Sequence, residues 1–519
     1  MKKTAYDQVI EYFNPQRAMQ RYKARAMIGA YEKSGGYIGA SRTRPALGAY
    51  NPMSGDVNED TIMDLPTLRT RARDLVRNAP IAGGALNTMV SYVVGTGLSM
   101  RSTIHGSRLG LSTSEAGIWQ DDVNARFTDW AESTDCDIAR GMNFYSIQAL
   151  AFNSFLLSGD VFALMTQAER NGRNRPAIQL IEADRVCNKD DARDTANMIS
   201  GISLDDYGCP TFYSICNQHP TSWKPGIKRS WTTIPAFGAQ TDRRNVIHLF
   251  EQKRPGQVRG VPILAPVIES LKQLSRYTEA ELAAAVIAGS YAIFLRMDPA
   301  AFGDLFDDKG KQSYMDSASK WKGDYPETGI NGPGKAVNLL PGESLEENNP
   351  GRPNSEFSGF VEAILSQVGC ELGLPLSVLT KVYDTSYSSA RSSLLDAWRV
   401  FKVRREMLAS YFCQPVYESW LTNEIATGTI KAKGFFDDPL ITHYYCQANW
   451  IGDGQGSIDP IKEVQAAKER INMGISTIAD EAIAWSGGNW WDIHKARTNE
   501  HNMRVGAGLE PPVLPTVGL

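Results

Sequence analysis

The segment Gly329-Ile-Asn-Gly-Pro-Gly334-Lys335-Ala336 has residue types that could hold a nucleotide phosphate, because it matches the G-x4-G-K skeleton of a P-loop. A P-loop also places a Ser or Thr hydroxyl on Mg²⁺ directly after the lysine, and Ala336 has no hydroxyl. The polar run 320–328 is not a buried strand, and the short run 336–340 before Pro341 is not a helix whose N-terminus could hold a phosphate. We therefore interpret the segment as a glycine turn.

Other residue patterns typical of catalysis are incomplete. The six histidines never stand four residues apart, and no H-E-x-x-H motif or His/Cys cluster is present. Ser317-x-x-Lys320 matches a β-lactamase spacing but lacks the partner motifs. The adjacent pairs Asp205/Asp206 and Asp307/Asp308 are more typical of solvated turns than of a Mg²⁺ site. No nucleophile, base and orienting group come together, so we predict no enzyme activity, no metal and no cofactor.

Length and composition indicate a multi-unit globular protein. The chain has 519 residues, with 42% hydrophobic and 22% charged side chains, which suits about two to four folded units. Seven cysteines without a C-x-x-C pair argue against a disulfide framework or a zinc ribbon and favour a reducing cytoplasm. The N-terminus lacks the apolar core of a secretory signal, and the longest apolar stretch, 282–295, is too short to span a bilayer. We expect no membrane association.

Charge is distributed unevenly along the chain. The formal net charge is -4, from 54 basic and 58 acidic side chains, which argues against a polybasic protein that wraps nucleic acid. Residues 1–44 contain nine Lys/Arg against three Asp/Glu, a balance of +6 that leaves -10 for the rest. A basic arm on an acidic body suggests different partners for the two parts.

The first half of the chain predicts an arm followed by an α+β unit. Residues 4–32 have the pattern of a basic amphipathic helix, and the Gly/Ser/Pro-rich run 34–55 that follows is typical of a linker, although a frayed helix packed on its own body would fit equally well. From Asp64 onwards, helices are expected at 65–78, 83–93, 114–130 and 143–157, with a strand at 161–166. Short strands are expected to follow up to residue 250 and to form a small antiparallel portion.

The second half is more helical. Apolar residues near 3.6 spacing predict one helix over 262–288, about 40 Å long at 1.5 Å per residue. A loop-rich region with one strand at 336–340 separates it from a helix at 356–372. After the break at Gly373-Leu-Pro375 and a polar loop, a helix is expected at 390–411, and Pro415 is expected to kink or end it. The fold class is therefore α+β and helix-rich, with long helices and small β portions.

Four segments, in this order along the chain, together form the most distinctive pattern in the sequence. They are 68–97, which begins Leu68-Arg-Thr-Arg; 248–282, which contains Arg254-Pro-Gly-Gln257-Val-Arg259-Gly-Val-Pro; 373–391, which contains Tyr387-Ser-Ser-Ala-Arg391; and 459–474, which begins Asp459-Pro-Ile-Lys-Glu. Together they resemble the lambda family of bacteriophage portal proteins. The resemblance covers about residues 68–475, which is most of the chain.

The resemblance implies a wing, stem, clip and crown architecture in a homododecameric ring at one capsid vertex of the virion. Double-stranded genomic DNA would pass through the ring without sequence specificity, and the ring would contact terminase, a head-tail connector protein, and the major capsid or scaffold protein. The implied segments are an arm and linker, 1–55; wing, 56–261; stem helix, 262–290; clip, 291–352; second stem helix, 353–375; channel loop region, 376–390; wing and crown helices, 391–500; and a flexible tail, 501–519.

Two groups of residues are candidates for contacts within such a ring. Lys381, Tyr383, Tyr387 and Arg391 bracket the polar loop and are candidates for the channel lumen or for subunit packing, while pairing of Arg391 with a nearby carboxylate is an equal alternative. Arg254, Gln257 and Arg259 form a polar turn before the stem and are candidates for hydrogen bonds between subunits.

An acidic body suits a channel in which DNA must slide, because each Lys/Arg-phosphate contact adds affinity. The alternatives are a minor capsid or head-completion protein without a channel, and a packaging enzyme, which the missing P-loop hydroxyl disfavours.

Overall fold

The structure, a computed structural model, divides the chain into two compact units, Met1–Glu59 and Asp60–Leu519. The predicted glycine turn at 329–336 and the predicted strand at 336–340 lie outside the residues that it describes. The described residues are 10–33, 37–40, 44–52, 54–170, 172–222, 225–289, 293–297, 309–310, 312, 316, 343–347, 356–383, 386–456, 459–487 and 490–509.

The first unit contains the basic helix that the sequence predicts. Helix α2 spans Pro15–Lys33 and is preceded by a helical turn that begins at Ile10. The side chain of Asn14 accepts a hydrogen bond from the backbone N–H of Arg17 at 3.2 Å, which satisfies one of the free donors at the helix start. A short 3-10 turn follows at Ile38–Ala40.

Two consecutive helices open the second unit after α3, which spans Val57–Ile62. Helix α4 spans Leu65–Asn78, as predicted, although the side chain of Asp64 makes no capping hydrogen bond. Helix α5 spans Pro80–Val93 and so begins three residues before the predicted start. Proline fits the first turn of a helix, where its missing N–H would have no partner.

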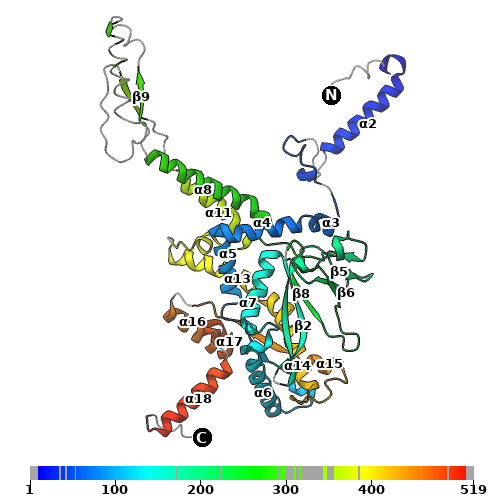
Figure 1. Cartoon of the computed structure of the whole chain (residues 1–519), viewed down its shortest axis with the longest axis vertical. Helices are drawn as coiled ribbons and strands as arrows, with labels where there is room; N and C mark the ends of the chain where they lie inside the picture. Colours follow the sequence, from blue (N-terminus) through cyan, green and yellow to red (C-terminus); the bar gives the residue numbers. More distant parts are fainter. Residues whose placement is uncertain are drawn as a thin grey trace. The chain divides into compact units, whose positions relative to one another are not determined.

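A three-stranded antiparallel sheet stands at the centre of this unit, in the order β3-β2-β8. Strand β2 (Asp160–Arg170) pairs with β3 (Arg173–Glu182) on one side and with β8 (Val246–Phe250) on the other. Helix α7 (Phe144–Ser158) is connected to β2 by the single residue Gly159, and it packs along this sheet (Figure 1). A second antiparallel sheet contains β4 (Met198–Ile199), β5 (Ile202–Leu204), β6 (Pro210–Cys216) and β7 (Trp231–Pro235).

A long-range strand pair joins the early and late parts of the chain. Strand β1 (Ser99–Ser102) pairs antiparallel with β11 (Ala448–Ile451). Helix α6 (Thr113–Glu132) follows β1 and begins with a capping box between Ser112 and Glu115. Local periodicity could not predict a pairing between strands so far apart in sequence.

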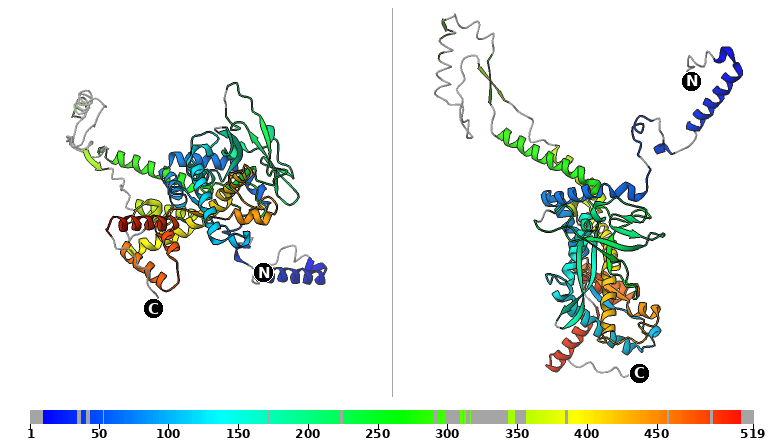
Figure 2. Two further views of the ribbon diagram at one scale, coloured as in Figure 1. Left: turned by 90° about the horizontal axis from the view of Figure 1, so that it is seen from below. Right: turned by 45° about the vertical axis from the view of Figure 1, so that its right-hand side comes forward.

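Helices α8 (Ile268–Gly289) and α11 (Phe357–Leu372) lie side by side, as Figures 1 and 2 show. The ring of Tyr277 stacks on Phe357 with centroids 5.4 Å apart, and α8 also contacts α4. The chain before α8 forms turns, including a 3-10 turn at Ala265–Val267, so the predicted helix begins six residues late. Between the two helices, β9 (Ile293–Met297) pairs with β10 (Glu343–Glu347), a strand that the sequence did not predict.

Pro415 lies inside a nearly continuous helix. Helix α12 (Leu376–Thr380) is followed by α13 (Tyr387–Leu408), a π-helical turn (Ala409–Cys413) and α14 (Gln414–Ala426). Proline lacks the N–H that an α-helical turn needs, and the wider π turn directly before it accommodates that loss. The predicted end of the helix at Pro415 is therefore wrong, because the helical backbone continues through it, and the predicted alternative, a kink, stays a prediction.

Four helices complete the described chain: α15 (Pro439–Tyr445), α16 (Pro460–Asn472), α17 (Ile478–Ser486) and α18 (Trp490–Gly506). Their starts at Asp438, Asp459 and Thr477 are capped by those side chains. Helices α16 and α18 bury no side chain. Among the described residues, no helix is both long enough and apolar enough to cross a membrane.

The main hydrophobic core joins α5, α6, α7, α13 and α14. Its centre is an aromatic cluster around Phe127, which lies 5.1 Å from Trp420 and 5.5 Å from Tyr417, measured between ring centroids. A second, smaller core lies between the two sheets and includes Phe162 and Tyr213. The observed architecture is helix-rich α+β, as predicted.

Candidate functional site

The fully buried carboxylate of Asp160 is the centre of an ionic cluster at the start of β2. Its Oδ2 accepts a hydrogen bond from Nε of Arg259 at 2.6 Å, and its Oδ1 accepts one from Nη2 of Arg69 at 3.0 Å. His248 on β8 lies 3.4 Å from Oδ2 through its Nε2. The cluster therefore joins α4, two strands of the central sheet and the segment that leads to α8.

The two guanidinium groups stabilise the ionised form of Asp160. Burial alone would raise the pKa of this carboxyl, but Arg259 and Arg69 outweigh burial and hold the pKa well below its usual range. Burial lowers the pKa of His248, although its contact with Asp160 opposes part of that effect. The ring of His248 is stacked between Phe162 and Phe250, each 4.2 Å away between centroids. His248 is thus a buried, mainly neutral histidine.

The cluster continues to the surface through Asp184. This carboxylate contacts Arg69 at 3.4 Å and His219 at 3.6 Å, and it also pairs with Arg73. Glu182, Asp184 and His219 bring possible metal-binding atoms within 4.8 Å of one another. However, Arg73 is paired with both carboxylates, and its positive charge disfavours a cation at the same place. We interpret the group as an ion-pair network.

Arg259 and Gln257 are not accessible for the predicted hydrogen bonds between subunits, because their side chains are buried inside one chain. Arg259 also donates to the carbonyl oxygens of Val186, Ser200 and Ala183 at 2.7–2.9 Å. Gln257 accepts from the N–H of Lys253 and donates to the carbonyl of Arg259, each at 2.8 Å. Arg259 therefore holds the turn before α8 against the segments around Ala183, Val186 and Ser200, and Gln257 holds the turn itself together.

Arg254 is the exposed member of the same turn. Its Nη1 lies 2.7 Å from Oδ2 of Asp60, and about half of each side chain is exposed. A contact of Arg254 with another subunit stays a prediction.

Sequence reasoning did not single out Asp160, although one signal was available. Asp160 stands between Gly159 and the apolar run Val161-Phe-Ala-Leu. A carboxylate at the start of a buried strand needs a cationic partner, because an unpaired buried charge is very unfavourable. Its partners come from residues 69, 248 and 259, and only the folded chain brings them together.

The polar loop between α12 and α13 contains the other candidates. Lys381 is exposed and adopts a left-handed backbone conformation, with φ of 59°, where it ends α12. Tyr383 is 51% exposed, and partial burial together with the nearby Tyr92 raises its pKa. Tyr387 is the first residue of α13, and its side chain lies outside the described part. A lumen or subunit contact by these three residues stays a prediction.

Arg391 pairs within the chain. Its Nη2 lies 3.7 Å from Oε1 of Glu463 on α16, which is the carboxylate pairing that the sequence left open. Both residues border a groove of about 650 Å³ between α13, α16 and α17. Apolar side chains such as Leu395 and Val464 line this groove, so it suits packing rather than catalysis.

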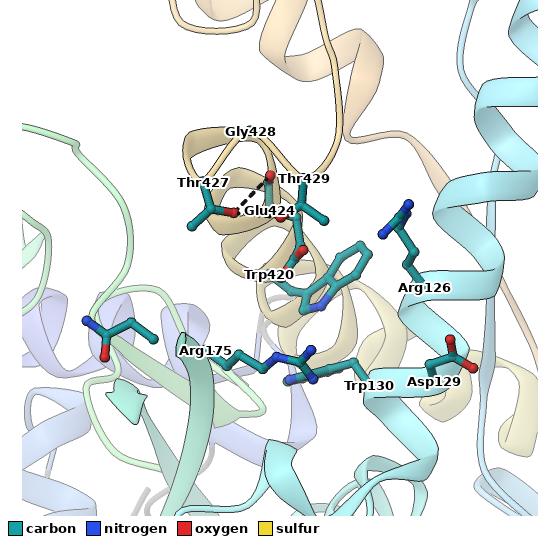
Figure 3. A pocket seen from close by; sticks show the side chains of 10 residues that line it. Arg126, Asp129, Trp130, Arg175, Trp420, Glu424, Thr427, Gly428 and Thr429 are labelled. Carbon is teal, nitrogen blue, oxygen red and sulfur yellow. Dashed lines mark hydrogen bonds between the residues drawn. The ribbon is translucent and has the colours of Figure 1, made fainter. Parts of the chain in front are cut away.

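A second hollow, of about 640 Å³, lies between α6, β3 and α14 (Figure 3). Trp130 and Trp420 line it, and Arg175 extends from β3 towards both indoles. Asp129 and Glu424 add negative charge to the lining. The residues that line it include no histidine, cysteine or lysine, so the hollow offers binding contacts rather than a nucleophile with its base.

Comparison with known proteins places these features in a family. The model for "Phage portal protein, lambda family" matches residues 43–405. The chain belongs to the lambda family of phage portal proteins. The matched range contains Asp160, Arg259, Lys381 and Arg391, whereas the whole of α2 and the helices from α14 onwards lie outside it.

Two curated portal proteins are similar to the chain along almost all of its length. Portal protein B of Escherichia phage lambda is 27% identical over 501 residues, which cover 94% of this chain and 93% of that protein. The portal protein of Escherichia phage N15 is 27% identical over 506 residues, which cover 94% and 92%.

Solved structures of gene transfer agent particles also match. A chain of the virion of the native particle has a TM-score of 0.46 at 13% identity, covering 83% of this chain and 93% of that one. A chain of the neck of the native particle, computed with C12 symmetry, has a TM-score of 0.45 at 11% identity, covering 85% and 97%.

Proposed function

We propose that the chain is the portal protein of a phage-type virion. Copies of it form a ring at one capsid vertex, through which double-stranded DNA enters during packaging and leaves during ejection. A ring of twelve copies is the stoichiometry that the family resemblance implies. The observation that carries this proposal is the match of the portal family model to residues 43–405.

Self-association is supported by apolar side chains exposed on α8 and α11. Leu282 and Val286 of α8 are 67% and 62% exposed, and Phe360 of α11 is 52% exposed. Large apolar side chains that gather on one pair of helices are typical of a surface covered by a protein partner. In a ring, the stem helices of the adjacent copies provide that cover.

Passage of DNA is supported by the charge of the body. Helix α11 contains two glutamates, Glu362 and Glu371, and no Lys or Arg. A wall of this charge makes few phosphate contacts, so the DNA stays mobile. Lys381 and Tyr383 stay candidates for contact with the channel lumen or for subunit packing. Contact with DNA in the channel is independent of base sequence.

The remaining segments are assigned by their order along the chain. The proposed clip, 291–352, docks terminase and the head-tail connector, and the arm, 1–55, contacts the capsid or scaffold protein. The wing, stem and crown segments keep the boundaries given by the sequence. The protein itself is structural, and terminase supplies the ATPase that drives packaging.

Native mass spectrometry and negative-stain imaging of the purified full-length chain test the proposal. Closed rings of about twelve copies with a central hole are expected. A stable monomer that hydrolyses ATP would contradict it and favour a packaging enzyme. A discrete oligomer without a hole would favour a head-completion protein.

A further inference from the structure

The exposed face of α6 is strongly acidic. Five of its exposed residues are carboxylates, and Arg126 is its single basic residue. The buried residues of α6, among them Val123 and Phe127, occupy the opposite side of the helix, so the carboxylates share one face. Ile118, which is 69% exposed, lies among them. The five carboxylates are Glu115, Asp121, Asp122, Asp129 and Glu132.

Part of this face is already neutralised, and part is not. Arg126 donates to both carboxylate oxygens of Asp122 at 2.9 Å, and Glu115 is held in the capping box. Among the described residues, Asp129 and Glu132 take part in no ion pair. Asp129 also borders the hollow of Figure 3, whose lining includes Glu424 of α14. The C-terminal half of α6 therefore presents negative charge that Arg126 offsets only in part.

Helix α2 has the complementary charge. Residues 12–31 contain four basic side chains and no Asp or Glu: Arg17, Arg21, Lys23 and Arg25. Phe13, Arg17, Arg21 and Ala24 border one hollow along the helix, which places them on one face. Phe13 is 80% exposed. Intervals of three and four residues are the spacing with which a helix fits onto a partner surface.

The acidic face of α6 is long enough to receive the basic face of α2. Residues 115–132 of α6 extend over about 25 Å and residues 17–25 of α2 over about 12 Å, at 1.5 Å per residue. An isolated helix of this size is only marginally stable in water, so α2 needs a partner surface. The unit Met1–Glu59 carries nine Lys/Arg against five Asp/Glu, a net +4 that leaves -8 for the rest of the chain's -4.

We propose that α2 of one copy docks on the acidic face of α6 in a second copy. Arg17 and Arg21, which are four residues apart, pair with Asp129 and Glu132, which are three residues apart. This proposal rests on the proposed ring, which fixes neighbouring copies close together and so raises the effective concentration of each arm at its neighbour. Each exposed ion pair contributes little, so the docking depends on several pairs together and weakens with salt.

A photo-crosslinking experiment on the full-length protein tests this docking. The photo-reactive amino acid p-benzoylphenylalanine replaces Ala24, and equal amounts of isotopically labelled and unlabelled protein are mixed before assembly. Irradiation followed by peptide mass spectrometry is expected to join Ala24 peptides to peptides from residues 115–132, with labelled and unlabelled copies mixed in the products.

Charge reversal identifies the contact. The double variant D129K/E132K should reduce these cross-links at least tenfold, and adding R17E/R21E to it should restore them. R17K/R21K, which keeps the charge of the arm, and D206K/E469K, which reverses two exposed carboxylates elsewhere, should leave the yield unchanged.

Three outcomes would overturn the docking. The first is rings with no cross-link to α6, and the second is cross-links confined within single copies. The third is an arm that binds duplex DNA in an anisotropy assay, loses that binding in R17E/R21E and gives no α6 cross-link. Native mass spectrometry of the same samples separates the two proposals, because monomers would remove the ring and the docking together, whereas uncross-linked rings would remove the docking alone.

Discussion

Nε of Arg259 donates to Oδ2 of Asp160 at 2.6 Å, and neither side chain is exposed to solvent. Arg259 lies nine residues before the start of α8, and Asp160 begins the central strand of the main sheet. The turn before α8 is therefore fixed to the sheet by a buried ion pair with further hydrogen bonds to backbone carbonyls.

Replacing Arg259 should destabilise the fold strongly. R259M leaves one guanidinium, Arg69, on a buried carboxylate and leaves several carbonyls without a donor, so we expect a loss of about 3–5 kcal/mol in the free energy of unfolding. The matched control is R254A, which removes an exposed pair with Asp60 and should lose at most about 1 kcal/mol. Urea denaturation followed by tryptophan fluorescence measures both. Equal losses in the two variants would mean that the buried pair contributes no more than an exposed one.

The free energy of unfolding should decrease as the pH is lowered, and His248 should account for part of this decrease. Burial depresses the pKa of this histidine below its unfolded value of about 6.5. The unfolded chain therefore binds a proton first as the pH falls, so this stabilisation is complete above about pH 6.5 and is lost below it, with a slope of at most about 1.4 kcal/mol per pH unit.

The variant H248Q should flatten the dependence of unfolding free energy on pH between about 5 and 6.5. H494Q, which changes an exposed histidine on α18, should keep the slope of the original chain. An unchanged slope in H248Q would assign the acid sensitivity to other groups. At lower pH, Asp160 and Asp184 contribute in the same direction, because both carboxyl pKa values are depressed in the folded chain.

Gly260 should tolerate no side chain. A Cβ atom added there would lie 1.9 Å from the carbonyl oxygen of Gly159, and backbone cannot move aside as a flexible side chain can. We expect G260A to lose more than about 3 kcal/mol of stability or to fail to fold, because the turn before α8 passes directly against the entry to β2. G256A in the same turn has open space around its Cβ and only a positive φ of 80°, so it should lose about 1–2 kcal/mol. Similar thermal midpoints for the two variants would contradict the close contact.

The sequence predicted helices well where one local pattern decides the structure. The 65–78 helix and the end of the 356–372 helix were placed to the residue, because apolar spacing and the break at Gly373 are local signals. Prediction from the sequence failed where a partner distant along the chain decides the structure. Asp160, the β1–β11 pair and the burial of Arg259 all depend on contacts that close more than 90 residues of chain. Arg259 in particular looked like a surface residue, since arginine is rarely buried without such partners.

The exposed apolar residues of α8 should control assembly without affecting the fold. Leu282 is 67% exposed, so L282K should change the unfolding free energy of one copy by no more than about 0.5 kcal/mol. In a ring it would bury a charge in an apolar contact, so native mass spectrometry should show dissociation into smaller species. Q273K, an exposed change on the same helix, should leave the oligomer intact. If L282K rings match those of the original chain, the contact between copies lies on another face.

Removing residues 1–55 should separate ring formation from the role of the arm. The exposed apolar residues Leu282, Val286 and Phe360 belong to the unit Asp60–Leu519, so we expect the truncated chain to form rings at low salt. If α2 docks on the neighbouring α6, the truncated rings lack that stabilising contact between copies. They should therefore dissociate at a lower sodium chloride concentration than the full-length rings. Mass photometry over a salt series measures this midpoint, and co-assembly with capsid and scaffold proteins measures incorporation, which should fall. Complete loss of oligomers at every salt concentration would instead make the arm an essential part of the ring interface, and an unchanged midpoint would leave it a contact only for the capsid or scaffold.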